Sequence, residues 1–177
     1  MAETPNLSLS DGVVTLRPPD ERDLDALELG IHDPDVVRWI GPANGSAADV
    51  LALNRVRAAH GSPTFAICLD DGACVGHVWL NVRADDATIG SVGYWLLPAV
   101  RGRGLATRSV RLISDWAVEA LGIRTLRLTT EPDNLRSQAV AERSGFTRIG
   151  VLEGRGEIAG RKIDLVLFER LPRGEPD

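Results

Sequence analysis

The fold is decided by the stretch GYWLLPAVRGRGLA, residues 93–106. Its apolar first half ends at Pro98 and is typical of a strand, whereas apolar residues recur at helical spacing from Leu105 to Leu121. Gly102 and Gly104 therefore fall in the turn between a strand and a helix. Glycine lets the backbone turn sharply, and the first N–H groups of a helix are unsatisfied and carry the positive end of its dipole. The sequence thus predicts an anion-binding turn that suits a phosphate.

Two arginines add positive charge to this turn. Arg101 and Arg103 flank Gly102, and their guanidinium groups would join the backbone amides in holding two adjacent phosphates, so we expect a ligand with a pyrophosphate. Two other glycine-rich schemes fit poorly. The Walker loop requires a Gly-Lys-Ser/Thr ending, and the dinucleotide fingerprint requires glycine where Thr107 stands. A nucleotide-dependent oxidoreductase that uses the same glycines is the alternative interpretation of this turn.

Strand-like and helix-like segments alternate on both sides of the turn. A hairpin is predicted around Asp70-Asp71-Gly72. The helix predicted after its N-cap residue Ser46 places Val50, Leu51, Leu53 and Val56 near one face. The predicted strands are Val13–Arg17, Thr64–Leu69, Ala73–Asn81, Ala87–Leu97, Thr125–Thr130, Phe146–Leu152 and Ile163–Arg170. The predicted helices are Asp23–Leu29, Ala47–His60, Leu105–Leu121 ending at Gly122, and Asn134–Ser144 ending at Gly145.

Composition bounds the class of protein. The 177 residues, 44% of them hydrophobic, suit a single domain over residues 1–177, with an ordered core from about 12 to 171 and polar tails at Met1–Asp11 and Arg173–Asp177. The net charge of -5 is opposite to the footprint of a nucleic-acid binder, so no nucleic acid is expected as partner. No stretch suits a membrane span or a signal peptide, which predicts a cytoplasmic location without a membrane partner. Cys68 and Cys74 are expected to be reduced core thiols.

Several motifs extend the pattern beyond the turn. Arg101, Gly104 and Ala106 occupy the marked positions of an R/Q-x-x-G-x-G/A signature. Together with GYWL at 93–96, NLRS at 134–137, Gly145-Phe146, TLRP at 15–18 and HDP at 32–34, they resemble the GNAT superfamily of N-acetyltransferases and in particular its RimJ/RimL-type branch. The resemblance runs from about residue 13 to residue 171. It implies an α+β GNAT fold, with a mixed, mostly antiparallel central sheet of about seven strands, splayed central strands and about four flanking helices.

The resemblance also implies where acetyl-CoA would bind. In this family the glycine turn wraps the pyrophosphate of coenzyme A, and the pantetheine arm enters the gap between the splayed strands. Main-chain groups at residues 95–97 would pair with the pantetheine amides. Asn134 would hydrogen-bond the cofactor, although capping the helix that follows is an alternative role for it. The implied cofactor-binding residues are Trp95, Leu96, Leu97, Arg101, Gly102, Arg103, Gly104, Leu105, Ala106, Thr107, Asn134 and Ser137, and no metal is expected.

The catalytic groups are implied less directly. Many family members place a tyrosine seven residues after the asparagine, where it protonates the leaving thiolate, but Ala141 stands there in this chain. In the RimJ/RimL-type branch a serine that matches Ser137 assists the departing sulfur, so the resemblance implies this role for Ser137. The candidates for a general base are Glu153 and Glu157, followed by Glu131 and Asp164.

The expected reaction is direct attack of a neutral primary amine on the thioester of acetyl-CoA. An α-amine, with a pKa of about 7.7–8.0, requires less help from a base than a lysine amine, with a pKa of about 10.4. We therefore expect an N-acetyltransferase acting on a protein N-terminal α-amine or a small-molecule amine. A noncatalytic acyl-CoA sensor is the alternative, because the tyrosine is absent. The acceptor pocket is expected near residues 33–59 and the terminal strand loop, with Trp39 and Trp79 as possible lining residues, and the branch suggests a homodimer.

Overall fold

Eight strands form one sheet in the computed structural model, which describes residues 7–172. Their order is β1-β2-β3-β4-β5-β6-β8-β7, and all neighbours are antiparallel except β5 and β6. The strands are β1 (Leu9–Ser10), β2 (Thr15–Arg17), β3 (Thr64–Cys68), β4 (Cys74–Val82), β5 (Ile89–Leu96), β6 (Thr125–Thr130), β7 (Thr147–Ile158) and β8 (Arg161–Arg170). The helices are α1 (Leu24–Ile31), α2 (Pro34–Ile40), α3 (Ala47–Ala59), α4 (Leu105–Leu121) and α5 (Leu135–Arg143), with short 3-10 turns at Glu21–Asp23 and Pro98–Val100.

The predicted α+β fold is confirmed, but two elements are additional. Helix α4 and strand β6 have the predicted bounds, and the described chain has eight strands rather than seven and five α-helices rather than four. Strand β1 lies inside the segment expected to be a tail, because it pairs with β2. Helix α2 begins at the N-cap residue Asp33, with Pro34 in its first position. The rest of the predicted tails, residues 1–6 and 173–177, lies outside the described residues.

Two local predictions are wrong. Leu53 and Val56 are 51% and 55% exposed, because the buried face of α3 is set by Leu51 together with residues 47 and 54. The terminal hairpin is longer than predicted. Its turn lies at Ala159-Gly160, where both residues have positive φ angles of 49° and 76°, so β7 continues to residue 158 and contains Glu153 and Glu157.

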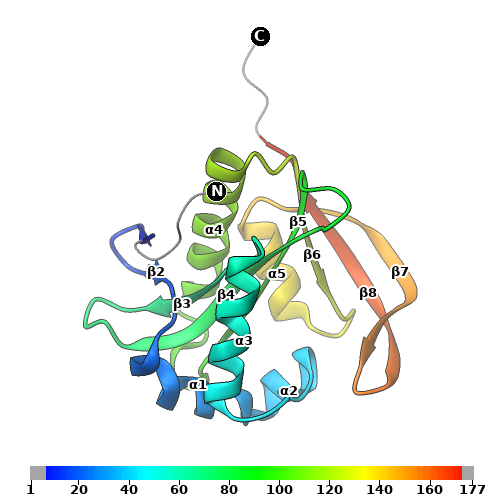
Figure 1. The fold of residues 1–177 in the computed structure, drawn as a ribbon. Helices are drawn as coiled ribbons and strands as arrows, with labels where there is room; N and C mark the ends of the chain where they lie inside the picture. Colours follow the sequence, from blue (N-terminus) through cyan, green and yellow to red (C-terminus); the bar gives the residue numbers. More distant parts are fainter. Residues whose placement is uncertain (1–6, 173–177) are drawn as a thin grey trace.

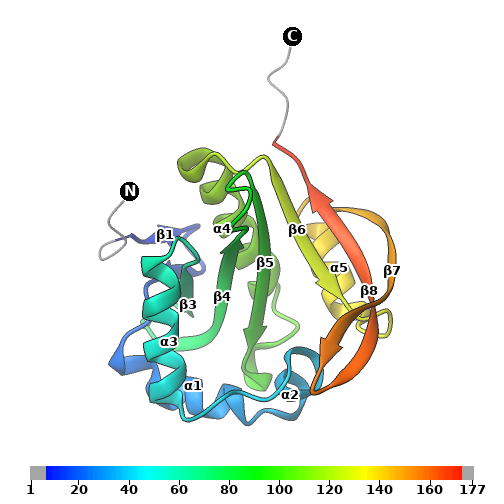
Figure 2. The ribbon, with the colours of Figure 1, turned by 45° about the vertical axis from the view of Figure 1, so that its right-hand side comes forward.

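Helices cover both faces of the sheet (Figures 1 and 2). On one face, residues of α4 such as Ile113 and Ala117 pack with strand residues such as Val78 and Leu126 in the larger apolar cluster. On the other face, α1, α2 and α3 form a smaller cluster around Trp95. The strand β5 thus contributes to both clusters, which fixes its position between the two helical layers.

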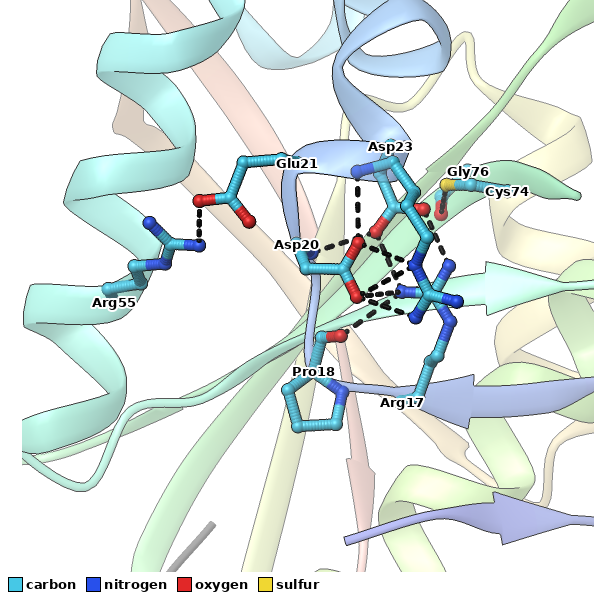
Figure 3. Close-up of polar contacts among 9 residues, drawn as sticks. Arg17, Pro18, Asp20, Glu21, Asp23, Arg55, Cys74 and Gly76 are labelled. Atoms are coloured by element: carbon cyan, nitrogen blue, oxygen red, sulfur yellow. Dashed lines mark hydrogen bonds and ion pairs between the residues drawn. The ribbon is translucent and has the colours of Figure 1, made fainter. Parts of the chain in front are cut away.

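A buried ion pair holds the chain where it leaves β2 for α1 (Figure 3). Arg17 donates two hydrogen bonds, of 2.8 and 2.7 Å, to the carboxylate of Asp23, which is 1% exposed. The same carboxylate accepts from the backbone N–H of Asp20, and the Asp20 carboxylate accepts from the backbone N–H of Arg22. The arginine of the TLRP segment therefore has a structural role, because it neutralises the carboxylate beneath the first helix.

Strands β5 and β6 part after a short parallel contact. They are paired only between residues 89–91 and residues 125–127. Beyond this contact β5 continues beside β4, whereas β6 continues beside β8, and Figure 2 shows the two strands diverging. The splayed central strands that the resemblance implies are therefore present.

Gly30 in α1 provides the space for the ring of Trp95. A methyl group at Gly30 would lie 2.3 Å from Cη2 of that ring. We expect Gly30→Ala to lower the free energy of unfolding by about 1–2 kcal/mol, since overpacking outweighs the gain in helix propensity. Denaturant unfolding measures the difference. Gly150→Ala is the matched control, because its Cβ would meet nothing within 4 Å. Equal losses of stability in the two variants would contradict the close contact.

Candidate functional site

The parting of β5 and β6 leaves one side of β5 without a strand partner from residue 92 onward. Antiparallel pairing with β4 uses the main-chain groups of alternate residues. Leu97 donates its N–H to the carbonyl of Val75 at 2.8 Å, so the odd-numbered residues near this end of β5 face β4. The groups that face the gap therefore belong to the even-numbered residues Val92, Tyr94 and Leu96.

This alternation corrects part of the predicted pantetheine contact. Trp95 and Leu97 turn their main-chain groups toward β4 and away from the gap. Leu96 faces the gap, but its carbonyl already accepts a hydrogen bond of 2.9 Å from Nε of Arg101. Tyr94, which was not among the predicted cofactor-binding residues, has main-chain groups that face the gap, and the period of two along a strand would have separated the two sets of residues.

The glycine turn lies at the wide end of the gap and leads into α4. Gly102 and Gly104 have φ angles of 78° and 77°, the left-handed conformation that favours glycine. Gly104 is the N-cap of α4 and no side chain caps this helix, which leaves its first N–H groups available to a ligand. The side chains of Leu105 and Ala106 are buried and apolar, so these residues offer only backbone amides, whereas Thr107 is partly buried.

The side chain of Arg101 does not lie where the sequence predicts it. Its guanidinium group donates to Asp33 at 2.5 Å and to Asp35 at 2.7 Å, in addition to the carbonyl of Leu96. The Nε, Nη1 and Nη2 atoms of Arg101 all donate hydrogen bonds to groups outside the turn. Arg103, the other arginine predicted at this turn, has an exposed side chain. Arg101 ties the end of β5 to the N-terminus of α2.

The pKa of Asp33 reflects this contact. Burial raises the pKa of the carboxyl, but the hydrogen bonds from Arg101 and from the backbone N–H of Val36 outweigh it, and the pKa lies below its ordinary value. Asp33 is therefore an ionised helix cap and the counter-ion of Arg101 at once.

Helix α5 brings Asn134 and Ser137 to the other side of the gap. The side-chain oxygen of Asn134 accepts from the backbone N–H of Ser137 at 3.1 Å, so Asn134 is the N-cap of α5. The hydroxyl of Tyr94 lies 3.3 Å from the hydroxyl of Ser137. Ala141 is fully buried in the larger apolar cluster. The structure thus joins Ser137 to a hydroxyl from β5.

The acidic candidates separate into different environments. A cavity of about 220 Å³ is lined by Glu131 and Glu157, together with Trp39 of α2. Glu131 is 7% exposed and accepts from Arg38 at 2.7 Å and from Arg161 at 3.3 Å. The remaining lining residues are Thr129, Thr130, Gly156, Ile158, Ile163 and Leu165.

The other two candidates do not reach this cavity. Glu153 is exposed on β7 and does not line it. Asp164 accepts a 2.7 Å hydrogen bond from the backbone N–H of Gly154, where the pairing of β7 with β8 is irregular. Asp164 therefore stabilises the irregular strand. Trp79, also considered for a pocket, packs with the Trp95 cluster.

His77 of β4 lies directly against Trp95. The two rings are stacked with centroids 5.1 Å apart, His77 is 2% exposed, and its Nε2 has no hydrogen-bond partner among residues 7–172. Burial lowers the pKa of His77 to about 4. The ring is therefore neutral at pH 7 and packs as an aromatic residue.

Two properties of the described residues concern membrane spans and metal sites. Between residues 7 and 172, no helix has the length and apolar character needed to cross a membrane. In the same range, no group of three or more His, Cys, Asp or Glu side chains is arranged to hold a metal ion. Cys68 and Cys74 pair in register across the β3–β4 hairpin and are free thiols, as predicted.

Known proteins match most of the chain. A family model described as the acetyltransferase (GNAT) domain matches residues 14–147. The uncharacterized N-acetyltransferase p20 of Bacillus licheniformis is 25% identical over 166 residues, which cover 90% of this chain and 93% of p20. The probable N-acetyltransferase YjcK of Bacillus subtilis (strain 168) is 30% identical over 99 residues, or 48% of this chain. The match covers 55% of YjcK, and a match to the putative ribosomal N-acetyltransferase YdaF of the same organism covers 57% of YdaF, so the chain spans little more than half of these two proteins.

Solved structures share the fold over nearly the whole chain. RimJ of Mycobacterium smegmatis, solved in complex with CoA-disulfide, superposes with a TM-score of 0.82 at 27% identity, covering 95% of this chain and 88% of RimJ. The overall fold of this chain is thus shared with RimJ. The chain belongs to the acetyltransferase (GNAT) domain family, and its likeness is to the RimJ/RimL-type members.

The contact of Arg101 with α2 gives a stability prediction. We expect Asp33→Ala to lower the free energy of unfolding by about 2–3 kcal/mol, because it removes the cap of α2 and leaves a partly buried guanidinium with one carboxylate fewer. The side chain of Asp33 is 6% exposed and that of Asp35 is 48% exposed. Asp35→Ala is therefore the matched control, with an expected loss below about 1 kcal/mol. Equal losses in denaturant unfolding would refute the assignment.

The neutral state of His77 predicts a pH dependence. Since the folded-state pKa lies below the ordinary 6.5, the unfolded chain binds a proton first as the pH falls. The contribution of His77 to the free energy of unfolding is therefore fully present above pH 6.5. It declines toward pH 4, by roughly 3 kcal/mol. His77→Phe should remove this part of the decline in unfolding free energy measured between pH 7 and 4. His60→Gln, at an exposed histidine, should retain it; an identical profile for all three proteins would contradict the prediction.

Proposed function

We propose that this protein transfers an acetyl group from acetyl-CoA to a primary amine, either a protein N-terminal α-amine or a small-molecule amine. The observation that carries the proposal is the left-handed turn at Gly102 and Gly104, which presents uncapped amides of α4 beside the gap between β5 and β6. RimJ, the 27% identical neighbour, was solved with a coenzyme A derivative, which supports the same ligand for this chain.

The turn suits the pyrophosphate of coenzyme A. The amides of residues 102–107 and the positive end of α4 favour an anion, and the exposed Arg103 adds a cationic donor. Arg101 contributes by holding the turn in place through Asp33 rather than by binding phosphate. The pantetheine arm would lie along the unpaired side of β5, where Val92, Tyr94 and Leu96 face the gap.

The cavity of Glu131, Glu157 and Trp39 is our candidate for the acceptor site. The β6 residues that line it lie just beyond the segment of β6 that pairs with β5, so an amine bound there would approach the same gap. Attack by the neutral amine places negative charge on the thioester oxygen, which a preorganised N–H group would stabilise. Ser137 would donate a hydrogen bond to the departing sulfur. Asn134, already the cap of α5, would position Ser137.

Coenzyme A binding and acetyl transfer are tested together. We expect coenzyme A to raise the melting temperature, and acetyl-CoA to release free thiol in the presence of an amine panel. Arg103→Ala should weaken the Kd for coenzyme A about 3–10-fold, because one charge-assisted contact is lost. Arg155→Ala, an exposed arginine on β7, is the control and should bind as the wild type. Tight binding without turnover on any amine would favour an acyl-CoA sensor, whereas binding of NAD in place of coenzyme A would favour the oxidoreductase alternative.

A further inference from the structure

Tyr94 is the single tyrosine of the chain, and its hydroxyl meets the first turn of α5. The residue lies on β5 with its ring partly buried against the larger apolar cluster. Its Oη lies 3.3 Å from Oγ of Ser137, which is 43 positions later in the chain. Among residues 7–172, Tyr94 supplies the only side-chain hydrogen bond to that serine hydroxyl. The contact bridges the two halves of the parted sheet.

The direction of this hydrogen bond follows from the chemistry of the two hydroxyl groups. Burial raises the pKa of Tyr94, and the contact with Ser137 offsets part of the rise, so the phenol keeps its proton at neutral pH. A phenol is the stronger donor of the pair, and the bond runs from Tyr94 to the oxygen of Ser137. Because Ser137 accepts there, its own proton points away from Tyr94.

The backbone of Ser137 is held as well. Its N–H donates to the side chain of Asn134 at 3.1 Å, which fixes the first turn of α5. With the backbone fixed by Asn134 and the hydroxyl oriented by Tyr94, the serine has little rotational freedom left. A preorganised donor of this kind stabilises developing charge without the cost of reorienting during the reaction.

We propose that Tyr94 is a positioning residue that orients the Ser137 hydroxyl toward the sulfur of the departing thiol. This inference rests on the proposed function. As the carbon–sulfur bond breaks, Ser137 donates a hydrogen bond to the thiolate, and the proton that finally reaches sulfur is the one the attacking amine loses on forming the amide. Neither hydroxyl group gains or loses a covalent bond. Helix α5 has no hydroxyl at position 141, where the buried Ala141 stands. The hydroxyl of Tyr94 on β5 lies near Ser137 instead.

A double-mutant cycle tests the coupling. Tyr94→Phe keeps the ring and removes the hydroxyl, and we expect it to lower kcat about 5–10-fold with the KM for acetyl-CoA changed less than twofold. Ser137→Ala should lower kcat at least as much. In the double variant, the loss should equal that of Ser137→Ala within twofold, since Tyr94 acts only through the serine. Losses that multiply, or a Tyr94→Phe variant with wild-type kcat, would overturn the proposal.

Coenzyme A affinity, measured by calorimetry, separates this role from packing. We expect the Kd for coenzyme A to change less than twofold in Tyr94→Phe; a Kd weakened as much as kcat would show a structural role and overturn the proposal. Ser114→Ala, which removes the hydroxyl of a fully buried serine in the middle of α4, is the control and should keep the wild-type kcat. A wild-type protein that neither binds coenzyme A nor releases thiol would refute the proposed function itself, whereas wild-type turnover with a neutral Tyr94→Phe refutes only the role of Tyr94.

Discussion

The parting of β5 and β6 is the constraint on which the rest of the structure depends. β5 is held along its whole length by β4, while β6 pairs over five residues with β8, so the two strands share only a three-residue contact. The sheet therefore consists of two halves joined at residues 89–91, with α4 against the first half and α5 against the second. A strand edge without a partner normally leaves backbone N–H and C=O groups without hydrogen bonds, which is unfavourable where they are buried. Here the unmet groups form the wall of a gap that a ligand with amide groups can fill.

Arg101 connects the two sides of this site. Its guanidinium group holds Asp33 and Asp35 at the start of α2 and the carbonyl of Leu96 at the end of β5, and it precedes the glycine turn by a single residue. Trp39, on the same short helix, lines the cavity beside β6. A seven-residue helix has little stability of its own, so its position depends on such tertiary contacts. The same arginine thus fixes both the glycine turn and one wall of the candidate acceptor cavity.

Local signals predicted the parts of the fold that local chemistry determines. Helix α4 has both its amphipathic pattern and the C-terminal Gly122, and its bounds were predictable to the residue. Helix α2 is too short to show a period, and only the Asp33-Pro34 pair marks its start. The role of Arg101 was not predictable, because its carboxylate partners lie 66 and 68 residues away in sequence. The change from a strand-like to a helix-like pattern predicted the position of the turn, and only the structure shows that Arg101 is engaged elsewhere.

The contacts of the carboxylates bear on which amine the proposed reaction would accept. Glu131 is buried in the cavity, but Oε1 of its carboxylate accepts hydrogen bonds from Arg38 and Arg161, and Oε2 accepts from Arg161 at 3.4 Å, so both oxygens are engaged. Glu157 reaches the cavity from an exposed position on β7, where water has access to its carboxylate. Neither carboxylate is arranged as a strong, water-excluded base. An acceptor that is already partly neutral at pH 7 suits such a site better than a lysine side chain, and an α-amine meets that condition.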